Sequence, residues 1–121
     1  MYNPKGYQNL IAWQLGIKLV SQIYEITKKF PSEERFGLIS QLRRASVSIP
    51  SNISEGYRRI TKNDFVYFLR IAHGSVAEVE TQLIISVQLG YFSQEEHKEI
   101  SVLIDELSKV LWGLIRARMV T

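Results

Sequence analysis

Four runs of apolar residues, spaced by three and four positions and separated by short connections, constrain the fold of this chain most strongly. Such spacing places side chains on one face of an α-helix, whereas the alternation typical of strands is scarce. We expect helices over residues 8–30, 34–59, 61–90 and 93–118. Because short connections make neighbouring helices antiparallel, the sequence predicts an all-α, up-down-up-down four-helix bundle that occupies residues 1–121 as one domain.

The expected helix ends carry recognisable signals. Pro31 should end the first helix, since the residue before a proline disfavours the helical region. Thr61 can cap the third helix, and Gly90 is a usual terminator. Ser93 and Glu96 have the spacing of a capping box, which indicates the start of the fourth helix.

Each predicted helix carries an apolar seam that we expect to form the core of the bundle. In order of helix, the seams are Leu10, Trp13, Ile17, Val20, Tyr24; Leu38, Leu42, Ala45, Ile49, Ile53, Tyr57; Phe65, Leu69, Ala72, Val76, Leu83, Val87; and Ile100, Leu103, Leu107, Leu111, Leu114. These positions have the spacing of core residues, and we read no cofactor pocket into them.

Two of the helices are apolar on more than one face. The additional positions are Leu15, Leu19, Ile23, Ile26 and Phe30 in the first helix, and Tyr67, Ile71, Ile85 and Leu89 in the third. Large exposed apolar surfaces are uncommon on monomers, so these flanks favour a homo-oligomer. The alternative is that wide flanks simply close a tight bundle, and this applies best to the first helix, whose two stripes adjoin.

The predicted second helix contains a polar stripe and an internal proline within residues 41–56. Six residues of the stripe fall within about 80° of the helical wheel: Gln41, Arg44, Ser48, Asn52, Glu55 and Arg59. Pro50 lacks a backbone donor and costs about 3 kcal/mol in a helix interior, so we expect a kink there. The polar side chains can satisfy backbone groups of a neighbouring helix, which makes the stripe a candidate interface or polar network.

Glu78 interrupts the second apolar face of the third helix, between Ile71 and Ile85. A carboxylate in apolar surroundings needs a cation, and Arg44 of the polar stripe is the first candidate. Together with Ser75, Glu78 therefore joins the candidate interface residues. The alternative is that Glu78 is free in water.

Positive charge gathers in the second quarter of the chain. The net charge is +3, and residues 28–62 alone hold eight basic and three acidic residues, a net charge of +5. Such a cluster attracts phosphate backbones, so the candidate contacts with RNA or DNA are Arg43, Arg58, Arg59 and Lys62. The alternatives are a solvated face, pairing between subunits, or a scaffold for another protein through an apolar patch around Trp112 and Met119.

The sequence offers little from which to build an enzyme. His73 and His97 fall on different helices without an obvious carboxylate relay, and Gln94 stands three residues before His97, where a di-iron bundle has glutamate. The glycines form no phosphate-binding loop, and no zinc spacing occurs. We therefore expect no enzymatic activity, no catalytic residue, no metal and no cofactor.

Several features favour a cytoplasmic protein without a membrane span. Cysteine is absent, which suits a reducing compartment, and the N-terminal residues contain no apolar signal core. The longest uncharged run, residues 81–94, has 14 residues, whereas a spanning helix needs about 20.

Several motifs resemble one known family. They are the Trp13 region, the Phe30-Pro31 turn, the block FGLISQLRRASVSIPSNISEGYRR, the pairs Asp64-Phe65 and Phe68-Leu69, the segment IAHGSVAEVETQL and the sequence LGY. With these motifs along nearly its whole length, the chain resembles the bacterial four-helix bundle family named for 23S rRNA intervening sequences. Ser54, where the family often has alanine, and His73 depart from the pattern.

The resemblance implies antiparallel helices, a homo-oligomer in the form of a pentamer, and no settled enzymatic activity. A distant relative of similar fold, the accessory variability protein of diversity-generating retroelements, binds nucleic acid and a reverse transcriptase, which favours nucleic acid only by analogy of fold. The positions that match the family are Arg44, Ser48, Asn52, Glu55, Gly56 and Arg59, with Gly74, Ser75 and Glu78. We expect helices to approach closely at Gly56 and Gly74.

Overall fold

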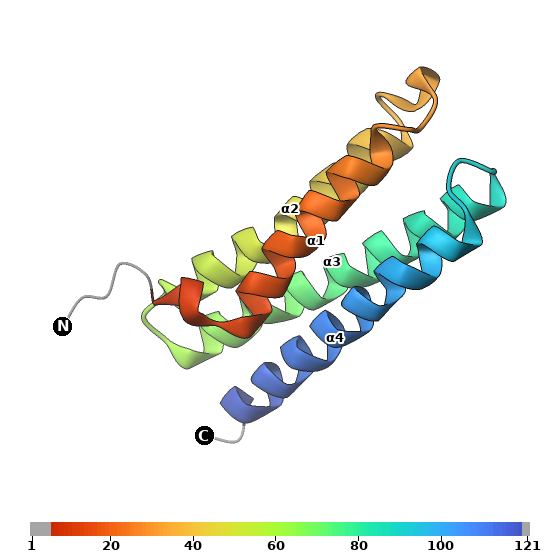
Figure 1. Ribbon diagram of the computed structural model, residues 1–121. Coiled ribbons are helices and arrows are strands. Elements are labelled where there is room, and N and C mark those ends of the chain that lie inside the picture. Colours follow the sequence, from red (N-terminus) through yellow and green to blue (C-terminus); the bar gives the residue numbers. More distant parts are fainter. Residues whose placement is uncertain (1–5, 120–121) are drawn as a thin grey trace.

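The computed structural model describes residues 6–119, which form four α-helices and no strand. The helices are α1 (Ile11–Thr27), α2 (Leu38–Tyr57), α3 (Lys62–Gln88) and α4 (Gln94–Met119). Two short 3-10 helices, η1 (Tyr7–Asn9) and η2 (Ser32–Glu34), precede α1 and α2. Figure 1 shows each helix running back along its predecessor, which is consistent with the predicted up-down arrangement.

The helix ends at the α2–α3 and α3–α4 connections follow the sequence signals. Thr61 Oγ1 accepts a hydrogen bond from the backbone N–H of Asp64 at 3.1 Å, so it caps α3. Gly90 has φ of 80°, and the N–H of Tyr91 reaches the carbonyl of Ser86 at 3.0 Å, as in a Schellman motif. The Ser93 hydroxyl accepts from the N–H of Glu96 at 3.1 Å, which confirms the predicted capping box.

The start of α2 differs from the prediction by one turn. After Pro31 the chain forms η2, and α2 begins only at Leu38, because Gly37 has a non-helical backbone. The side chain of Glu34 supplies the cap, since its Oε1 accepts from the N–H of Leu38 at 3.1 Å. Glu34, which the sequence suggested as the first helical residue, is thus a side-chain cap for the helix that follows it.

Pro50 lies inside α2 without ending it. The helix continues from Leu38 to Tyr57, and Pro50 is buried against α1. Gly16 of α1 makes this contact possible, because a Cβ at Gly16 would stand 3.4 Å from both Ile49 Cγ2 and Pro50 Cδ. The predicted kink at Pro50 stays a prediction.

The core of the bundle consists largely of the predicted seams of α2, α3 and α4. Leu42, Ile49 and Ile53 of α2 are fully buried, and so are Leu69 and Leu83 of α3. In α4 the buried positions are Ile100, Leu103, Ile104, Leu107, Leu111 and Ile115. Helix α2 packs most extensively on α3, whereas α1 and α4 share the fewest contacts of any neighbouring pair of α-helices.

The predicted core seam of α1 is wrong at Ile17 and Tyr24, whereas Leu10 and Trp13 of that seam pack against the core. Leu19 and Ile23, which the sequence assigned to a second flank, are fully buried, whereas Ile17 and Tyr24 of the predicted seam are about 40% exposed, at 41% and 39%. The reason is that the face nearest α2 is lined by small residues such as Gly16, so the helices approach along that face. Trp13 and Val20 are half-buried beside this contact.

The two glycines at which a close approach of helices was expected, Gly56 and Gly74, have different surroundings. A Cβ at Gly56 would stand 2.7 Å from Phe68 Cβ, which confirms that α2 and α3 cross closely there. At Gly74 a Cβ would meet nothing within 4 Å, so the prediction of a close approach within the chain is wrong at this position. Gly74 faces outward on α3, away from the other described helices. Within residues 6–119, no helix is long and apolar enough to cross a membrane.

Candidate nucleic-acid interface

Part of the predicted polar stripe lines a cavity between α2 and α3. Gln41, Arg44 and Ser48 of α2 and Glu78 of α3 border a space of about 290 Å³, together with Ala45 and Gln82. The Ser48 hydroxyl donates to the Ser75 hydroxyl at 2.5 Å, which links the two helices directly. The structure therefore brings together five of the predicted interface residues.

The predicted ion pair between Arg44 and Glu78 does not form within the chain. Both side chains line the same cavity and both residues are exposed, but the ion pairs among the described residues join Lys28 to Glu25, Lys29 to Glu96 and Arg59 to Glu55. The pair was expected because a buried carboxylate needs a cation. Since both side chains are exposed, water solvates each charge and no partner is required.

The remaining residues of the stripe make local contacts toward the end of α2. Asn52 donates through Nδ2 to the carbonyl of Ser48 at 2.7 Å, and this carbonyl lies one turn earlier on the same helix. Glu55 pairs with Arg59 at 2.8 Å, four residues apart. The Arg59 guanidinium also lies over the ring of Phe68, 4.9 Å from its centroid. These residues stabilise α2 and its crossing with α3.

The four predicted nucleic-acid contacts are divided between two places. Arg43 serves the contact of α1 with α2, because its Nε donates to Thr27 Oγ1 at 2.9 Å and its guanidinium lies over the Tyr24 ring. Arg58, Arg59 and Lys62 lie instead at or beside the α2–α3 connection. We call this end of the bundle, which also holds the C-terminal turn of α4, the basic end (Figure 1).

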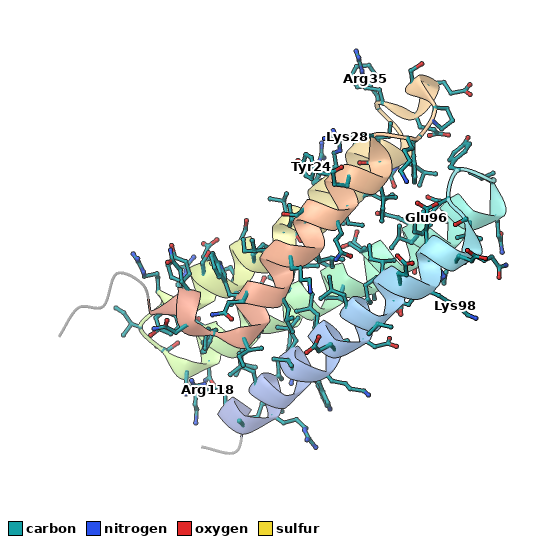
Figure 2. All side chains as sticks on the ribbon, viewed as in Figure 1. Tyr24, Lys28, Arg35, Glu96, Lys98 and Arg118 are labelled. Carbon is teal, nitrogen blue, oxygen red and sulfur yellow. The ribbon has the colours of Figure 1, made fainter. Side chains whose placement is uncertain are left out.

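A cleft at the basic end gathers three cationic side chains from two helices. It has a volume of about 460 Å³ and is lined by Lys62, Asn63, Val66, Tyr67 and Arg70 of α3 with Arg118 and Met119 of α4. We call it the basic cleft. No carboxylate of the described residues lines it, and Tyr67 is 60% exposed. Figure 2 places Arg118 at this end of the bundle and Arg35 at the opposite end.

The contacts inside the basic cleft position its cations. Arg70 Nη2 donates to Met119 Sδ at 3.2 Å, which joins α3 to the last turn of α4. The Arg118 guanidinium lies over the ring of Phe65, 5.4 Å from its centroid. Of the predicted nucleic-acid contacts only Lys62 lines this cleft, and the sequence reasoning missed Arg70 and Arg118. The spacing of Lys62, Val66 and Arg70 at four-residue intervals could have indicated the α3 wall.

At the opposite end of the bundle, two side-chain contacts of charged residues link separate parts of the chain. Lys29 Nζ donates to Glu96 Oε2 at 2.8 Å, from the α1–α2 connection to the start of α4. This contact and the Ser93 donors hold the pKa of Glu96 below its usual value, and the carboxylate raises the pKa of Lys29. The hydroxyl of Tyr91 donates to Glu34 Oε2 at 3.0 Å, which raises the pKa of Tyr91. We call this the paired end.

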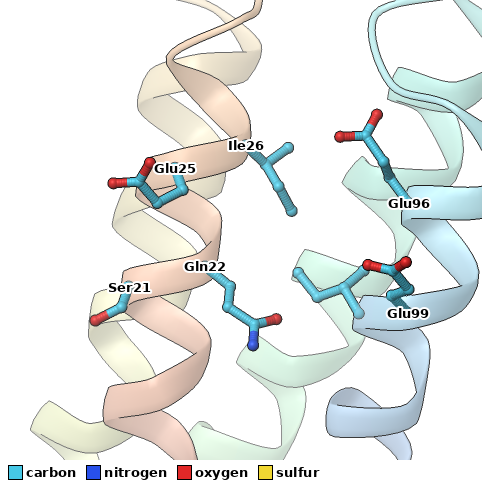
Figure 3. Close-up of a pocket in the computed structure, with 7 residues that line it drawn as sticks. Ser21, Gln22, Glu25, Ile26, Glu96 and Glu99 are labelled. Atoms are coloured by element: carbon cyan, nitrogen blue, oxygen red, sulfur yellow. The ribbon is translucent and has the colours of Figure 1, made fainter.

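A second groove, near the paired end, is bordered by acidic and apolar side chains. It occupies about 290 Å³ between α1 and α4 and is lined by Ser21, Gln22, Glu25, Ile26, Glu96, Glu99 and Ile100. Figure 3 shows Gln22 and Ile26 extending from α1 toward α4. Across residues 6–119, no group of three histidine, cysteine or acidic side chains is arranged to hold a metal ion.

One contact between side chains was not anticipated from the sequence. His73 Nε2 lies 3.2 Å from Ser108 Oγ, and the imidazole stacks on Trp112 with centroids 5.9 Å apart. Within the described chain His73 contacts no carboxylate, so the pair lacks the third group that orients a catalytic histidine. The two residues come from different helices, so their proximity could not be deduced from spacing.

The fold and the basic cleft define a small four-helix protein with cationic side chains gathered at one end. The chain belongs to the 23S rRNA-intervening sequence protein family, whose family model matches residues 8–113. A crystal structure of a protein of unknown function from the S23 ribosomal protein family of Bacteroides thetaiotaomicron is similar, with a TM-score of 0.77. The two share 23% identity over 87% of this chain and 98% of the other, which shows the fold. No curated protein matches this chain.

Proposed function

We propose that this protein is a non-enzymatic, self-associating accessory protein that binds nucleic acid, with RNA as the ligand to test first. The observation that carries the proposal is the basic cleft. Lys62, Arg70 and Arg118 line this cleft together from two helices, α3 and α4. Phosphate backbones bind to such clusters because the cations replace condensed counterions, which are released to solution.

Three properties of the basic cleft support a nucleic-acid ligand over a small inorganic anion. Its cations come from separate helical turns, so they can contact successive phosphates. Tyr67 offers an exposed aromatic ring among these cations, which a bare phosphate would not need. Two further arginines lie on the adjoining connection, Arg58 and Arg59, the second of which pairs with Glu55.

The test is direct binding of a labelled RNA to the purified protein. Affinity should be measured by fluorescence anisotropy at about 50 mM and 200 mM salt, because three phosphate contacts make the affinity fall steeply with salt. A steep fall supports the proposal. Absent binding at low salt, or an affinity that does not change with salt, contradicts it.

Self-association is the second part of the proposal, and the outer face of α3 supports it. Ile71, Ile85 and Leu89 are 37%, 41% and 53% exposed on that face. Gly74 lies between them with nothing within 4 Å of its missing side chain, so another helix could approach closely. Exposed apolar stripes of this kind are a common mark of a subunit contact. We propose a homo-oligomer, and the family resemblance favours a pentamer.

Native mass spectrometry tests the proposed association and counts the subunits. We expect Ile85→Glu to shift the protein to smaller species, since it places a charge in the apolar stripe. Val102→Glu is the matched control, because Val102 is 71% exposed on α4, outside this face. Equal behaviour of the two variants would remove the outer face of α3 as the contact.

A second candidate function is an oligomeric scaffold that binds another protein without nucleic acid. One observation favours it, namely a cleft of about 360 Å³ on α3 and α4 that is lined by His73, Ser108, Lys109 and Trp112. Trp112 is 46% exposed, and tryptophan is enriched where proteins meet. This function becomes the leading one if RNA binding is absent and Trp112→Ala abolishes capture of a protein partner.

A further inference from the structure

We propose that the basic cleft binds single-stranded nucleic acid, with one unpaired base stacked on Tyr67 and the flanking phosphates held by Lys62, Arg70 and Arg118. This inference rests on the proposed function and specifies its ligand. If this inference is correct, the cleft binds single strands more tightly than duplex. The geometry that points to it is an exposed aromatic ring enclosed by cations from two helices.

Tyr67 lies between two cations in the sequence of α3. Arg70 follows it by three residues, on a neighbouring row of the helix, whereas Lys62 precedes it by five residues, about 140° around the helix, and lines the same cleft from the first residue of α3. Arg118 approaches from the last turn of α4, across the cleft. A strand that crosses α3 here can therefore place a base on the ring while phosphates on both sides meet positive charge.

The Tyr67 ring has the support that a stacking platform needs. The ring of Phe68 meets it edge to face, with centroids 5.3 Å apart and an interplanar angle of 83°. Phe68 is itself half-buried at the α2–α3 crossing beside Gly56, so it belongs to the packed part of the bundle. With 60% of Tyr67 exposed in the single chain, its ring is accessible to a ligand there.

The cleft also offers contacts that suit an unpaired base. The Asn63 amide carries both donor and acceptor groups, which can meet the edge of a base. Val66 and Met119 provide apolar surface beneath it. A volume of about 460 Å³ is that of a small-ligand pocket, so it accommodates a nucleotide rather than a helix.

Duplex fits this site poorly for a physical reason. In a duplex each base is stacked on both faces and paired at its edge, so Tyr67 could contact it only after the base had been extruded. Single strands present unstacked bases, and stacking of one base on an aromatic side chain contributes about 1–3 kcal/mol. The ring therefore discriminates single strand from duplex, while the cations attract both.

The experiment compares Tyr67 variants on matched ligands. A single-stranded RNA of about 12 nucleotides and a duplex of the same sequence are titrated with wild type, Tyr67→Leu and Tyr67→Phe in the full chain. We expect Tyr67→Leu to weaken single-strand binding by about 5- to 150-fold without changing the salt dependence, whereas Tyr67→Phe stays near wild type. Duplex should bind more weakly than single strand to wild type and be unaffected by either variant.

Two outcomes separate this inference from the proposed function. If Lys62→Gln weakens binding but Tyr67→Leu does not, or if duplex competes as well as single strand, the inference is overturned while the nucleic-acid function stands. If wild type shows no salt-sensitive binding to either ligand, the function itself fails. Circular dichroism and native mass spectrometry of each variant show whether fold and subunit number are retained, and Tyr67→Phe, which keeps the ring, guards against a loss caused by packing.

Discussion

The two ends of the bundle differ in what their charged side chains contact. At the paired end, Lys29 meets Glu96 and Glu34 receives the Tyr91 hydroxyl, so the two connections at that end are joined through their side chains. At the basic end, cations converge on a cleft that no described carboxylate lines. Charged side chains at the paired end therefore link connections of the fold, whereas the basic cleft gathers like charges from α3 and α4.

The two ends differ in where their charged side chains are placed more than in which charged residues they contain. Both ends contain lysine or arginine close to the termini of helices, and both lie next to a connection between two helices. Lys62, Arg70 and Arg118 line one cleft, and surface charges of this kind interact weakly with one another in water. Under the proposed function, a bound phosphate backbone stabilises the folded protein, because a ligand that binds only the folded state raises its stability.

Substitution of Gly56 should have the largest effect on the basic end. A Cβ at Gly56 would stand 2.7 Å from Phe68 Cβ and 3.3 Å from the Phe65 carbonyl oxygen. Gly56→Ala should therefore lower the free energy of unfolding by about 1–3 kcal/mol, as overpacking does. Because Phe68 contacts Tyr67, this variant should also weaken RNA binding. Urea denaturation and anisotropy measure the two effects.

Gly74→Ala is the matched control for that prediction. Nothing lies within 4 Å of the position within the chain, so alanine should raise monomer stability by about 0.5–1 kcal/mol through its better helix propensity. If both glycine variants behave alike in urea, the close crossing at the basic end is not as described. A loss of oligomer in Gly74→Ala would instead indicate close packing of α3 against another subunit.

Removal of the Glu34 side chain should have an intermediate effect, at the paired end. Glu34→Ala loses the cap on the N–H of Leu38 and the contact with Tyr91. Loss of a helix cap costs about 1 kcal/mol, so the melting temperature should fall while RNA affinity stays unchanged. Glu33→Ala is the control, because Glu33 is exposed nearby without these contacts. A change in RNA affinity would contradict the proposal that RNA binds at the basic end independently of the paired end.

The smallest effect should be a pH-dependent one from Lys29 and Glu96. The fold lowers the pKa of Glu96 from 4.5, so its contribution is present above that value and is lost as pH falls through the folded pKa. It raises the pKa of Lys29 from 10.5, so that contribution is lost as pH rises through the folded pKa. Both contributions are therefore complete between about pH 5 and pH 10.

Glu96→Gln tests this pair while it retains a side chain suited to the capping box with Ser93. The melting temperature of wild type should exceed that of the variant at neutral pH, and the difference should disappear in acid below the folded pKa of Glu96. High salt should reduce the difference as well. A difference that persists unchanged in acid would show that it arises from packing or capping and not from charge.

Most of the fold could be predicted because the apolar periodicity indicates the helices and the capping residues indicate where they begin and end. The caps at Thr61 and Ser93 and the seams of α2, α3 and α4 follow from local rules that tertiary contacts did not override. The face of α1 could not be chosen from hydrophobicity, since that helix is apolar over most of its circumference. The signal that mattered was the small residue Gly16, which permits close approach to Pro50.

Less of the candidate site could be predicted, because it is assembled from separate helices. Lys62 was identified from charge density, but Arg118 reaches the cleft only through the packing of α4 on α3. Tyr67 was assigned to a subunit face, because an exposed aromatic residue on an apolar stripe suits either role. Arg43 was predicted to contact nucleic acid, but its side chain contacts Thr27 and Tyr24 of α1. Sequence spacing could not reveal these partners, because they lie on another helix.

The most direct test of the account is the salt dependence of RNA affinity in two charge-matched double variants. Lys62→Gln with Arg70→Gln removes two cations from the basic cleft, and Lys28→Gln with Lys98→Gln removes two from the paired end. The account predicts that the first variant alone binds more weakly, with the slope of log affinity against log salt less steep by about 1.4, which corresponds to two lost single-strand phosphate contacts. Equal losses in both variants would contradict it, because binding would then follow net charge and not the cleft.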